Sequence, residues 1–170
     1  AELRSQVFDD RVYVFTPKGE VVDLPTGSTP LDFAYAIHSE IGHRCIGAKV
    51  AGRIVPFTYQ LQMGDQIDII TQKNPNPSRD WLNPNLGFTH TAKSRAKIQA
   101  WFKKQDRDKN IPAGKELLDN ELARLNLSIK QVEPYALPRY NLKNLDDLYA
   151  GIGSGDIRLN LSLIHISEPT

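Results

Sequence analysis

Residues 12–71 constrain the fold of this chain most, because short apolar runs alternate there with clear turn signals. The run 12–16 alternates side chains with a period of two, which is typical of a strand. Pro17 then presets its own φ, and Gly19 accepts the positive φ of a bulge position. The apolar run 20–24 follows directly. The pattern therefore predicts two antiparallel strands joined as a hairpin.

Residues 30–41 have a helical period and follow the hairpin. Either Ser28 or Thr29 can cap the start of this helix, with a proline in its first turn, and Gly42 suits its end. The expected buried side comprises Phe33, Ala34, Ile37 and Ile41, and the roughly opposite side comprises Asp32, Ala36, Ser39 and Glu40. One amphipathic helix is therefore expected to lie across the sheet.

Three further strand signals complete this part of the chain. The run 46–50 alternates, Gly52 supplies a turn, residues 53–55 form a short return, and 66–70 is a final apolar-rich strand. A helix packed across a small mixed sheet is the β-grasp, or ubiquitin-like, plan, so the predicted fold class is α+β. No catalytic constellation is visible in these residues. A folded unit without a reaction centre indicates recognition.

The remainder of the chain changes from a proline- and asparagine-rich segment to helical patterns. Trp81 is expected to anchor the proline-rich segment, because a buried Trp contributes much of a small interface. Four helical signals follow, and the tripled glycine pattern G-x-G-x-G after the last of them predicts a loop. The helices are expected to run from a Thr91 cap to Gln105, to begin at Pro112, to begin at a Ser128 cap, and to cover Leu145 to Ile152.

These patterns divide the chain into five segments. Residues 161–170 resemble translated cloning or adapter sequence, and residues 1–10 resemble the remnant of a linker helix, so the chain is expected to be a piece of a longer protein. The expected segments are a linker-helix remnant at 1–10, a β-grasp domain at 11–73, a linker at 74–90, a small all-α domain at 91–160 and the tail at 161–170.

Composition narrows the functional classes. A formal net charge of +1 argues against a polycation that binds nucleic acid through bulk charge, but it leaves room for a local basic patch. A single cysteine, Cys45, excludes an internal disulfide framework and suits a reducing cytoplasm. No membrane span or signal peptide is visible. No metal-ligand spacing or cofactor motif is present, so neither a metal nor a cofactor is expected.

Two features carry candidate chemistry. His38 falls at the edge of the apolar stripe of the expected helix, beside Leu31 and Tyr35, where its ring either meets a ligand or is simply solvated. His43 and Arg44 add positive charge just after it. The densest basic run either holds phosphates or forms a solvated surface, and it comprises Lys93, Arg95, Lys97, Lys103, Lys104, Arg107 and Lys109.

The motifs F-T-P-K-G, D-F-A-Y-A-I-H and G-D-Q-I-D-I-I-T closely resemble the TGS domain, a β-grasp unit of threonyl-tRNA synthetases, certain GTPases and the RelA/SpoT family. The later stretches NPNPSRDWLNPNLGF, KSRAKIQAWFKKQDRDKNI, LPRYN and GIGSGDIR resemble the helical domain that follows TGS in RelA-type enzymes. The K-Q-D-R-D-K-N stretch is more similar to the RelA branch than to the SpoT branch.

This resemblance implies a regulatory fragment of a ribosome-associated (p)ppGpp synthetase, a GTP pyrophosphokinase of the bacterial stringent response. The catalytic synthetase domain of such proteins precedes TGS, so no catalytic residue is expected here. The implied partners are the 3′ CCA end of deacylated tRNA, the ribosome and the synthetase domain of the parent chain, in the cytoplasm. The family's tRNA-contacting histidine maps onto His38, and the expected tRNA-binding set is His38, Arg44, Lys73, Lys93, Arg95 and Lys97.

Three alternatives stay open at this point. The TGS unit could act inside its own protein, as an autoinhibitory module docked on the synthetase domain. The parent could be a bifunctional synthetase and hydrolase of the same family. A threonyl-tRNA synthetase would require metal-ligand spacing after Lys73, which is missing.

Overall fold

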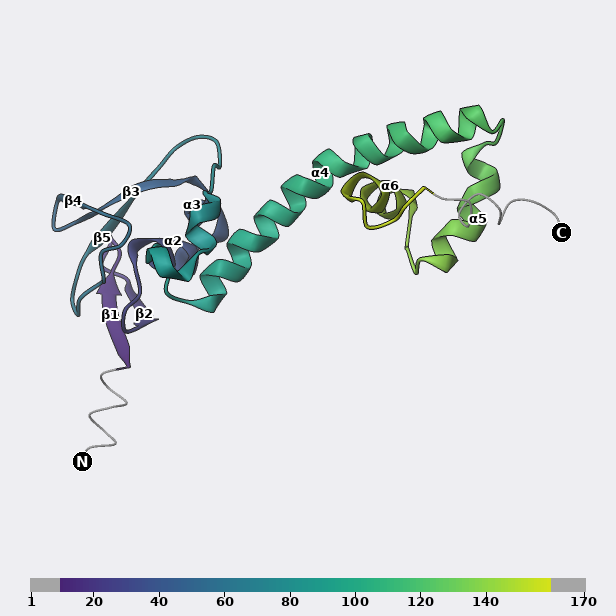
Figure 1. Ribbon diagram of the computed structural model, residues 1–170. Coiled ribbons are helices and arrows are strands. Elements are labelled where there is room, and N and C mark those ends of the chain that lie inside the picture. Colours follow the sequence, from purple (N-terminus) through teal and green to yellow (C-terminus); the bar gives the residue numbers. More distant parts are fainter. Residues whose placement is uncertain (1–9, 160–170) are drawn as a thin grey trace. The chain divides into compact units, whose positions relative to one another are not determined.

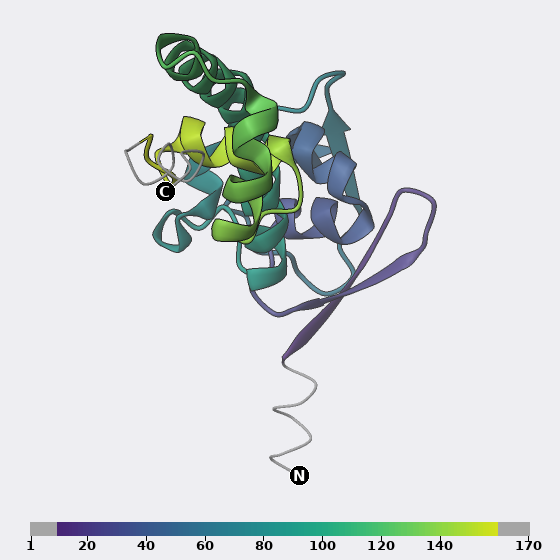
Figure 2. The ribbon, with the colours of Figure 1, turned by 90° about the vertical axis from the view of Figure 1, so that its right-hand side faces the viewer.

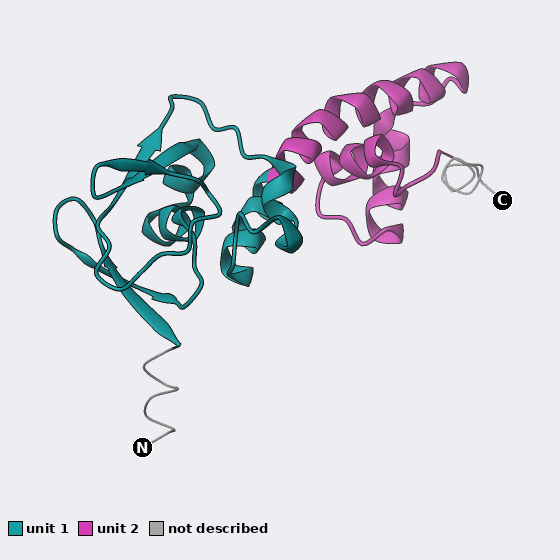
Figure 3. Ribbon diagram, turned by 60° about the vertical axis from the view of Figure 1, so that its left-hand side comes forward, with its two compact units in different colours: residues 1–101 teal, residues 102–170 magenta. Residues whose placement is uncertain are grey.

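The computed structural model describes residues 10–159, so the expectations for the ends of the chain, at 1–9 and 160–170, lie outside the described residues. The chain forms two compact units, residues 1–101 and 102–170 (Figure 3). The long helix α4, Ala92–Arg124, begins in the first unit and continues into the second.

The first unit contains the small sheet that the alternating patterns predict (Figure 1). Strands β1 and β2 form the antiparallel hairpin, and β3 lies between β4 and β5 in the order β4-β3-β5. A parallel bridge between Phe15 and Gln66 links the two groups of strands. The strands are β1 Arg11–Phe15, β2 Val21–Pro25, β3 Cys45–Val50, β4 Arg53–Val55 and β5 Ile67–Thr71. The predicted α+β class and strand order are confirmed.

The prediction of a single helix over residues 30–41 is wrong in one respect. The structure has two helices, α2 Pro30–Ile37 and α3 Ser39–Arg44, separated at His38 (Figures 1 and 2). Of the two expected caps, Thr29 is the one that precedes α2, and it forms a capping box with Asp32. His38 has φ −166° and ψ 143°, an extended conformation that ends α2.

The core of the first unit lies between the sheet and α2. Its buried apolar residues are Val12, Val14, Leu24, Phe33, Ala48, Leu61 and Ile67. Asp32 was expected on the polar side of the helix, but it is only 2% exposed. Its carboxylate accepts hydrogen bonds from Thr29, His90 and Thr91, so a buried charge is compensated by donors that the helix pattern does not reveal.

The segment expected as a linker, residues 74–90, belongs to the first compact unit. It contains two short 3₁₀ helices, η1 Arg79–Leu82 and η2 Pro84–Leu86. Trp81 is buried and packs edge-on against Phe57, with ring centroids 5.8 Å apart. The expected anchoring by Trp81 is therefore confirmed, and it fixes the segment to the unit that precedes it.

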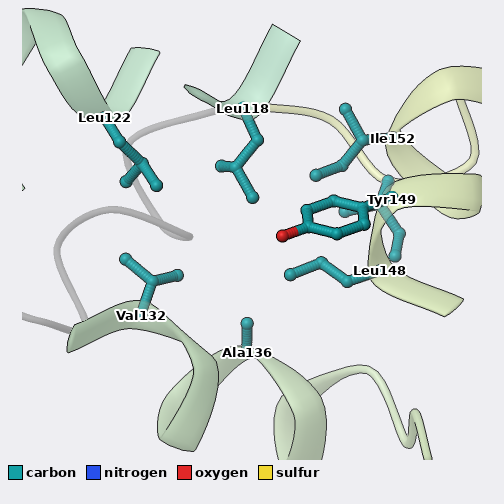
Figure 4. Packing of buried hydrophobic residues seen from close by; sticks show 8 residues of the cluster. Leu118, Leu122, Val132, Ala136, Leu148, Tyr149 and Ile152 are labelled. Atoms are coloured by element: carbon teal, nitrogen blue, oxygen red, sulfur yellow. The ribbon is translucent and has the colours of Figure 1, made fainter. Parts of the chain in front are cut away.

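The second unit is helical. Besides the later part of α4 it contains α5, Ile129–Arg139, and α6, Leu145–Ser154. Ser128 precedes α5 in a capping box with Gln131, as the sequence predicts. Figure 4 shows side chains of all three helices pointing into one core: Leu118 and Leu122 from α4, Val132 and Ala136 from α5, and Leu148, Tyr149 and Ile152 from α6.

Two local predictions for this half are wrong. Pro112 does not begin a new helix but lies inside α4. The carbonyl that loses its partner there belongs to Asp108, an exposed residue at which water can hydrogen-bond instead. Gly151 and Gly153 lie inside α6 and not in a loop, and only Gly155 follows the helix. A Cβ added at Gly153 would lie 2.0 Å from the carbonyl oxygen of Asn110, so glycine permits close backbone packing there.

Candidate functional site

A hollow of about 240 Å³ opens in the first unit between the two short helices and strand β5. Most of its lining is apolar, and the polar residues are cationic Arg44, acidic Asp68 and Thr71. The lining residues are Pro17, Phe33, Ile37, Ile41, Arg44, Ile67, Asp68, Ile69 and Thr71. An apolar cavity with a few polar groups is the usual form of a ligand site.

Arg44 gives this hollow its most specific feature. The residue ends α3, and its Nε atom is buried without a hydrogen-bond partner among the described residues. Nε carries an N–H that can only donate, and an unsatisfied buried donor costs about 1–3 kcal/mol. Because this atom is closed to solvent, a ligand acceptor in the hollow would remove this cost only after the Arg44 side chain turns its N–H towards it.

His38 lies at the junction of the two helices beside the hollow's wall residue Ile37. Its Nδ1 accepts a hydrogen bond of 3.0 Å from the backbone N–H of Glu40, which caps α3. A neutral ring with Nδ1 as acceptor carries its proton on Nε2. His38 is exposed, so this Nε2–H and the ring face are available to a ligand. The helical-wheel position expected for His38 is wrong, because α2 has already ended there.

The burial of His43 could not be predicted from the charge pattern. It was expected to add positive charge, but it is only 7% exposed, and its Nδ1 lies 3.0 Å from the hydroxyl of Tyr35. Its ring also approaches Trp101, with centroids 6.0 Å apart. Burial lowers the pKa of His43, Glu40 opposes this, and Lys97 adds to it. The distance between Tyr35 and His43 in the sequence does not predict the hydrogen bond between their side chains.

The remaining candidate cations do not converge on the hollow that Arg44 lines. Lys93 and Lys97 line a second hollow of about 250 Å³ in the same unit, together with Arg11. Lys97 already uses part of its hydrogen-bonding capacity inside the protein, because its Nζ donates to the carbonyl of Tyr35 at 2.9 Å. Arg95 makes a long contact of 3.5 Å to the carbonyl of Thr89, and Lys73 is exposed. Neither Lys73 nor Arg95 lines either hollow.

Two family models match the chain. The TGS domain matches residues 12–71, which hold the sheet, the two short helices and the hollow. The RelA/SpoT AH domain matches residues 101–160, which include α5, α6 and most of α4. The first match makes the chain a TGS-domain protein. With the second match and the relatives described next, the chain belongs to the RelA/SpoT family.

Its curated relatives are much longer than this chain. A GTP pyrophosphokinase of Haemophilus influenzae is 98% identical over 168 residues, covering 99% of this chain and 22% of the relative. A GTP pyrophosphokinase of Escherichia coli strain K12 is 74% identical over 159 residues, covering 94% and 21%. A probable guanosine-3′,5′-bis(diphosphate) 3′-pyrophosphohydrolase of a Synechocystis species is 47% identical over 169 residues, covering 98% and 22%. The chain thus spans about a fifth of these relatives.

Residues 10–159, which the structure describes, contain neither a candidate membrane span nor a candidate metal cluster. No helix among them has the length and apolar character needed to cross a membrane. No group of three or more His, Cys, Asp or Glu residues in this range is placed to hold a metal ion.

Proposed function

We propose that this chain is the regulatory TGS and AH region of a (p)ppGpp synthetase, and that its first unit reads the 3′ CCA end of deacylated tRNA. The observation that carries this proposal is Arg44, which lines the apolar hollow and whose buried Nε has no partner among the described residues. The family and the names of the relatives support the synthetase context. In the proposed setting the parent protein acts on the ribosome in the cytoplasm.

The chemistry of the hollow suits an unpaired nucleotide. Single-stranded nucleotides are recognised by stacking and by hydrogen bonds to exposed base edges. The exposed ring of His38 offers a stacking surface, and each base–aromatic stack contributes roughly 1–3 kcal/mol. Arg44 offers a donor to a base acceptor or a phosphate oxygen. One base against the apolar wall would therefore cover the exposed Ile37 and place its acceptors beside the Arg44 side chain.

The size of the hollow supports discrimination between uncharged and charged tRNA. A volume of about 240 Å³ lies below the roughly 300–1,000 Å³ of ordinary ligand pockets. We propose that it takes one terminal base and that an aminoacyl group on the same ribose weakens this placement. Lys93, beside the second hollow, is proposed to hold a tRNA or ribosomal RNA phosphate, with Lys97, Arg95 and Lys73 as further contributors.

Fluorescence anisotropy with labelled tRNA tests the proposal. The chain should bind deacylated tRNA more tightly than aminoacylated tRNA or tRNA that lacks its terminal adenosine. The substitution His38→Glu should weaken binding at least tenfold, because it removes the stack and places negative charge near phosphate. Gln60→Glu makes the same change of charge at an exposed residue outside the hollow, and it should leave the affinity within twofold.

The same measurement distinguishes tRNA sensing from the autoinhibitory alternative. Binding that weakens with salt indicates phosphate contacts. Absent binding, or equal binding of charged and uncharged tRNA, would reject the sensing proposal and favour docking on another domain of the parent. The relatives carry names of both pyrophosphokinases and a pyrophosphohydrolase, so the proposal applies to a synthetase or to a bifunctional parent.

A further inference from the structure

Helix α3 is a short element between the two residues proposed to contact the base, His38 before its start and Arg44 at its end. It spans six residues, Ser39–Arg44, and helices of this length are not stable in water without tertiary packing. His38 caps its start, and Arg44 is its last residue. Whatever holds α3 therefore sets the positions of both side chains.

The side chain of Tyr35, on α2, packs directly against α3. A Cβ added to Gly42 would lie 2.3 Å from the Tyr35 ring, so that ring rests directly on the backbone of α3. Tyr35 is 1% exposed, and burial raises the pKa of its hydroxyl, which therefore keeps its proton and can donate to Nδ1 of His43 at 3.0 Å. The Tyr35 and His43 rings meet edge to face, with centroids 5.2 Å apart and an interplanar angle of 72°.

Helix α4 closes the other side of this pair. The Trp101 ring lies 6.0 Å from that of His43 at an angle of 39°, and Lys97 donates to the carbonyl of Tyr35. The titratable and charged groups around the pair are Glu40 from α3 itself, Lys97 from α4 and the Cys45 thiol at the start of β3. His43 belongs to α3 and is thus contacted by side chains from both α2 and α4.

We propose that Tyr35 and His43 are positioning residues that hold α3 against α2, so that His38 and Arg44 stand at opposite ends of one docked helix beside the hollow. What that site binds rests on the proposed function. Neither Tyr35 nor His43 lines the hollow that Arg44 lines, so both act on a ligand there through the placement of α3. Tyr35 also lines the second hollow, beside Lys93 and Lys97.

Binding of deacylated tRNA by matched variants tests this role. Tyr35→Phe keeps the ring and removes one hydrogen bond, so affinity should fall about fivefold, the effect of about 1 kcal/mol. Tyr135→Phe makes the same change at a tyrosine that is 51% exposed and should have no effect. His43→Ala should weaken binding more than Tyr35→Phe. His43→Gln, whose amide oxygen can accept from Tyr35, should restore affinity to within twofold at pH 7. Wild-type affinity in a folded Tyr35→Phe or His43→Ala variant would overturn the proposal.

A second measurement examines the pair without RNA. The chain has two tryptophans, so Trp81→Phe leaves Trp101 as the reporter. A protonated imidazole quenches a neighbouring indole. Because burial lowers the pKa of His43, Trp101 emission should fall only once the pH is well below the ordinary histidine value of about 6.5, and His43→Gln should abolish this dependence. If the wild type fails to bind tRNA but shows this quenching, and Tyr35→Phe speeds amide exchange in α3, the proposed function fails while the docking of α3 stands. Unchanged exchange in α3 would reject the positioning role whatever the RNA result.

Discussion

The carboxylate of Asp32 accepts a hydrogen bond of 2.8 Å from the backbone N–H of His90, which lies 58 residues further along the chain. The same carboxylate accepts from the N–H of Thr29 at 2.9 Å and from the N–H and hydroxyl of Thr91 at 3.2 and 3.1 Å. One buried side chain therefore caps α2 and fixes the start of α4. This connection ties the end of the proline-rich segment to the first unit.

Replacing Asp32 with Asn should destabilise the first unit by about 2–3 kcal/mol, because an amide group turns one acceptor oxygen into a donor facing other donors. Urea unfolding followed by Trp81 emission would measure the loss. Asp23→Asn, at an exposed carboxylate paired with Arg11, is the matched control and should cost less than about 1 kcal/mol. Equal losses in the two variants would show that the Asp32 network does not hold the unit together.

Substitutions of Arg44 should separate stability from binding. Arg44→Leu removes the buried unsatisfied N–H, so it should leave the free energy of unfolding unchanged or raise it by about 1 kcal/mol. The same variant should lose at least tenfold in tRNA affinity, and Arg44→Lys should lose nearly as much, because Lys has no equivalent of Nε. Parallel urea titrations and tRNA-binding measurements would check the predicted direction of change in the free energy of unfolding and in the affinity. Full affinity in Arg44→Lys would mean that only the charge matters.

Gly153→Ala should disrupt the second unit. The added Cβ would lie 2.0 Å from the carbonyl oxygen of Asn110, and backbone on both sides prevents easy relief. We expect a loss of more than about 3 kcal/mol, in the range of severe overpacking. Gly155→Ala is the control, because nothing lies within 4 Å of its added Cβ and its φ of +88° alone should cost about 1 kcal/mol. Thermal unfolding followed by circular dichroism would rank the two variants.

His43 should make the first unit less stable in mild acid. Burial lowers its pKa, so below the ordinary value of 6.5 the unfolded chain binds a proton that the folded chain resists. The contribution of His43 is therefore complete above pH 6.5 and is lost progressively as the pH falls from there towards its lower folded pKa. The free energy of unfolding in urea, measured at pH 7 and pH 5, should fall less in His43→Gln than in the wild type. A parallel fall in both would assign the acid sensitivity to other groups.

Cys45 should be unreactive in the folded chain. It is 3% exposed, and burial raises its pKa to about 11, so almost no thiolate exists near neutral pH. A thiol-specific reagent at pH 8 should label it only after denaturant is added. Rapid labelling of the native chain would mean that β3 opens readily at its first residue.

The sequence predicts the strands of the first unit well because their signals are local. The turn at Pro17 and Gly19 needs only a preset φ and a positive φ, and Gly19 has φ +89°. Alternation with a period of two then places Val12 and Val14 in the core. The motif resemblance adds the TGS and helical domains, which both family models match.

Tertiary contacts decided what local patterns could not. The helical pattern predicts that Asp32 faces solvent. In the structure its carboxylate is buried and accepts hydrogen bonds from His90 and Thr91, which lie in a distant segment of the chain. His38 looks like a helical position until its own Nδ1 caps a second helix. Polar groups can be buried only where partners exist. His90 and Thr91, the partners of Asp32, are remote in sequence, whereas Glu40, the partner of His38, is two residues away. The sequence by itself therefore determined the strands of the first unit and the resemblance to the two domains. The folded structure decided where the helices break or continue, which polar side chains are buried, and that the Nε of Arg44 is left without a partner among the described residues.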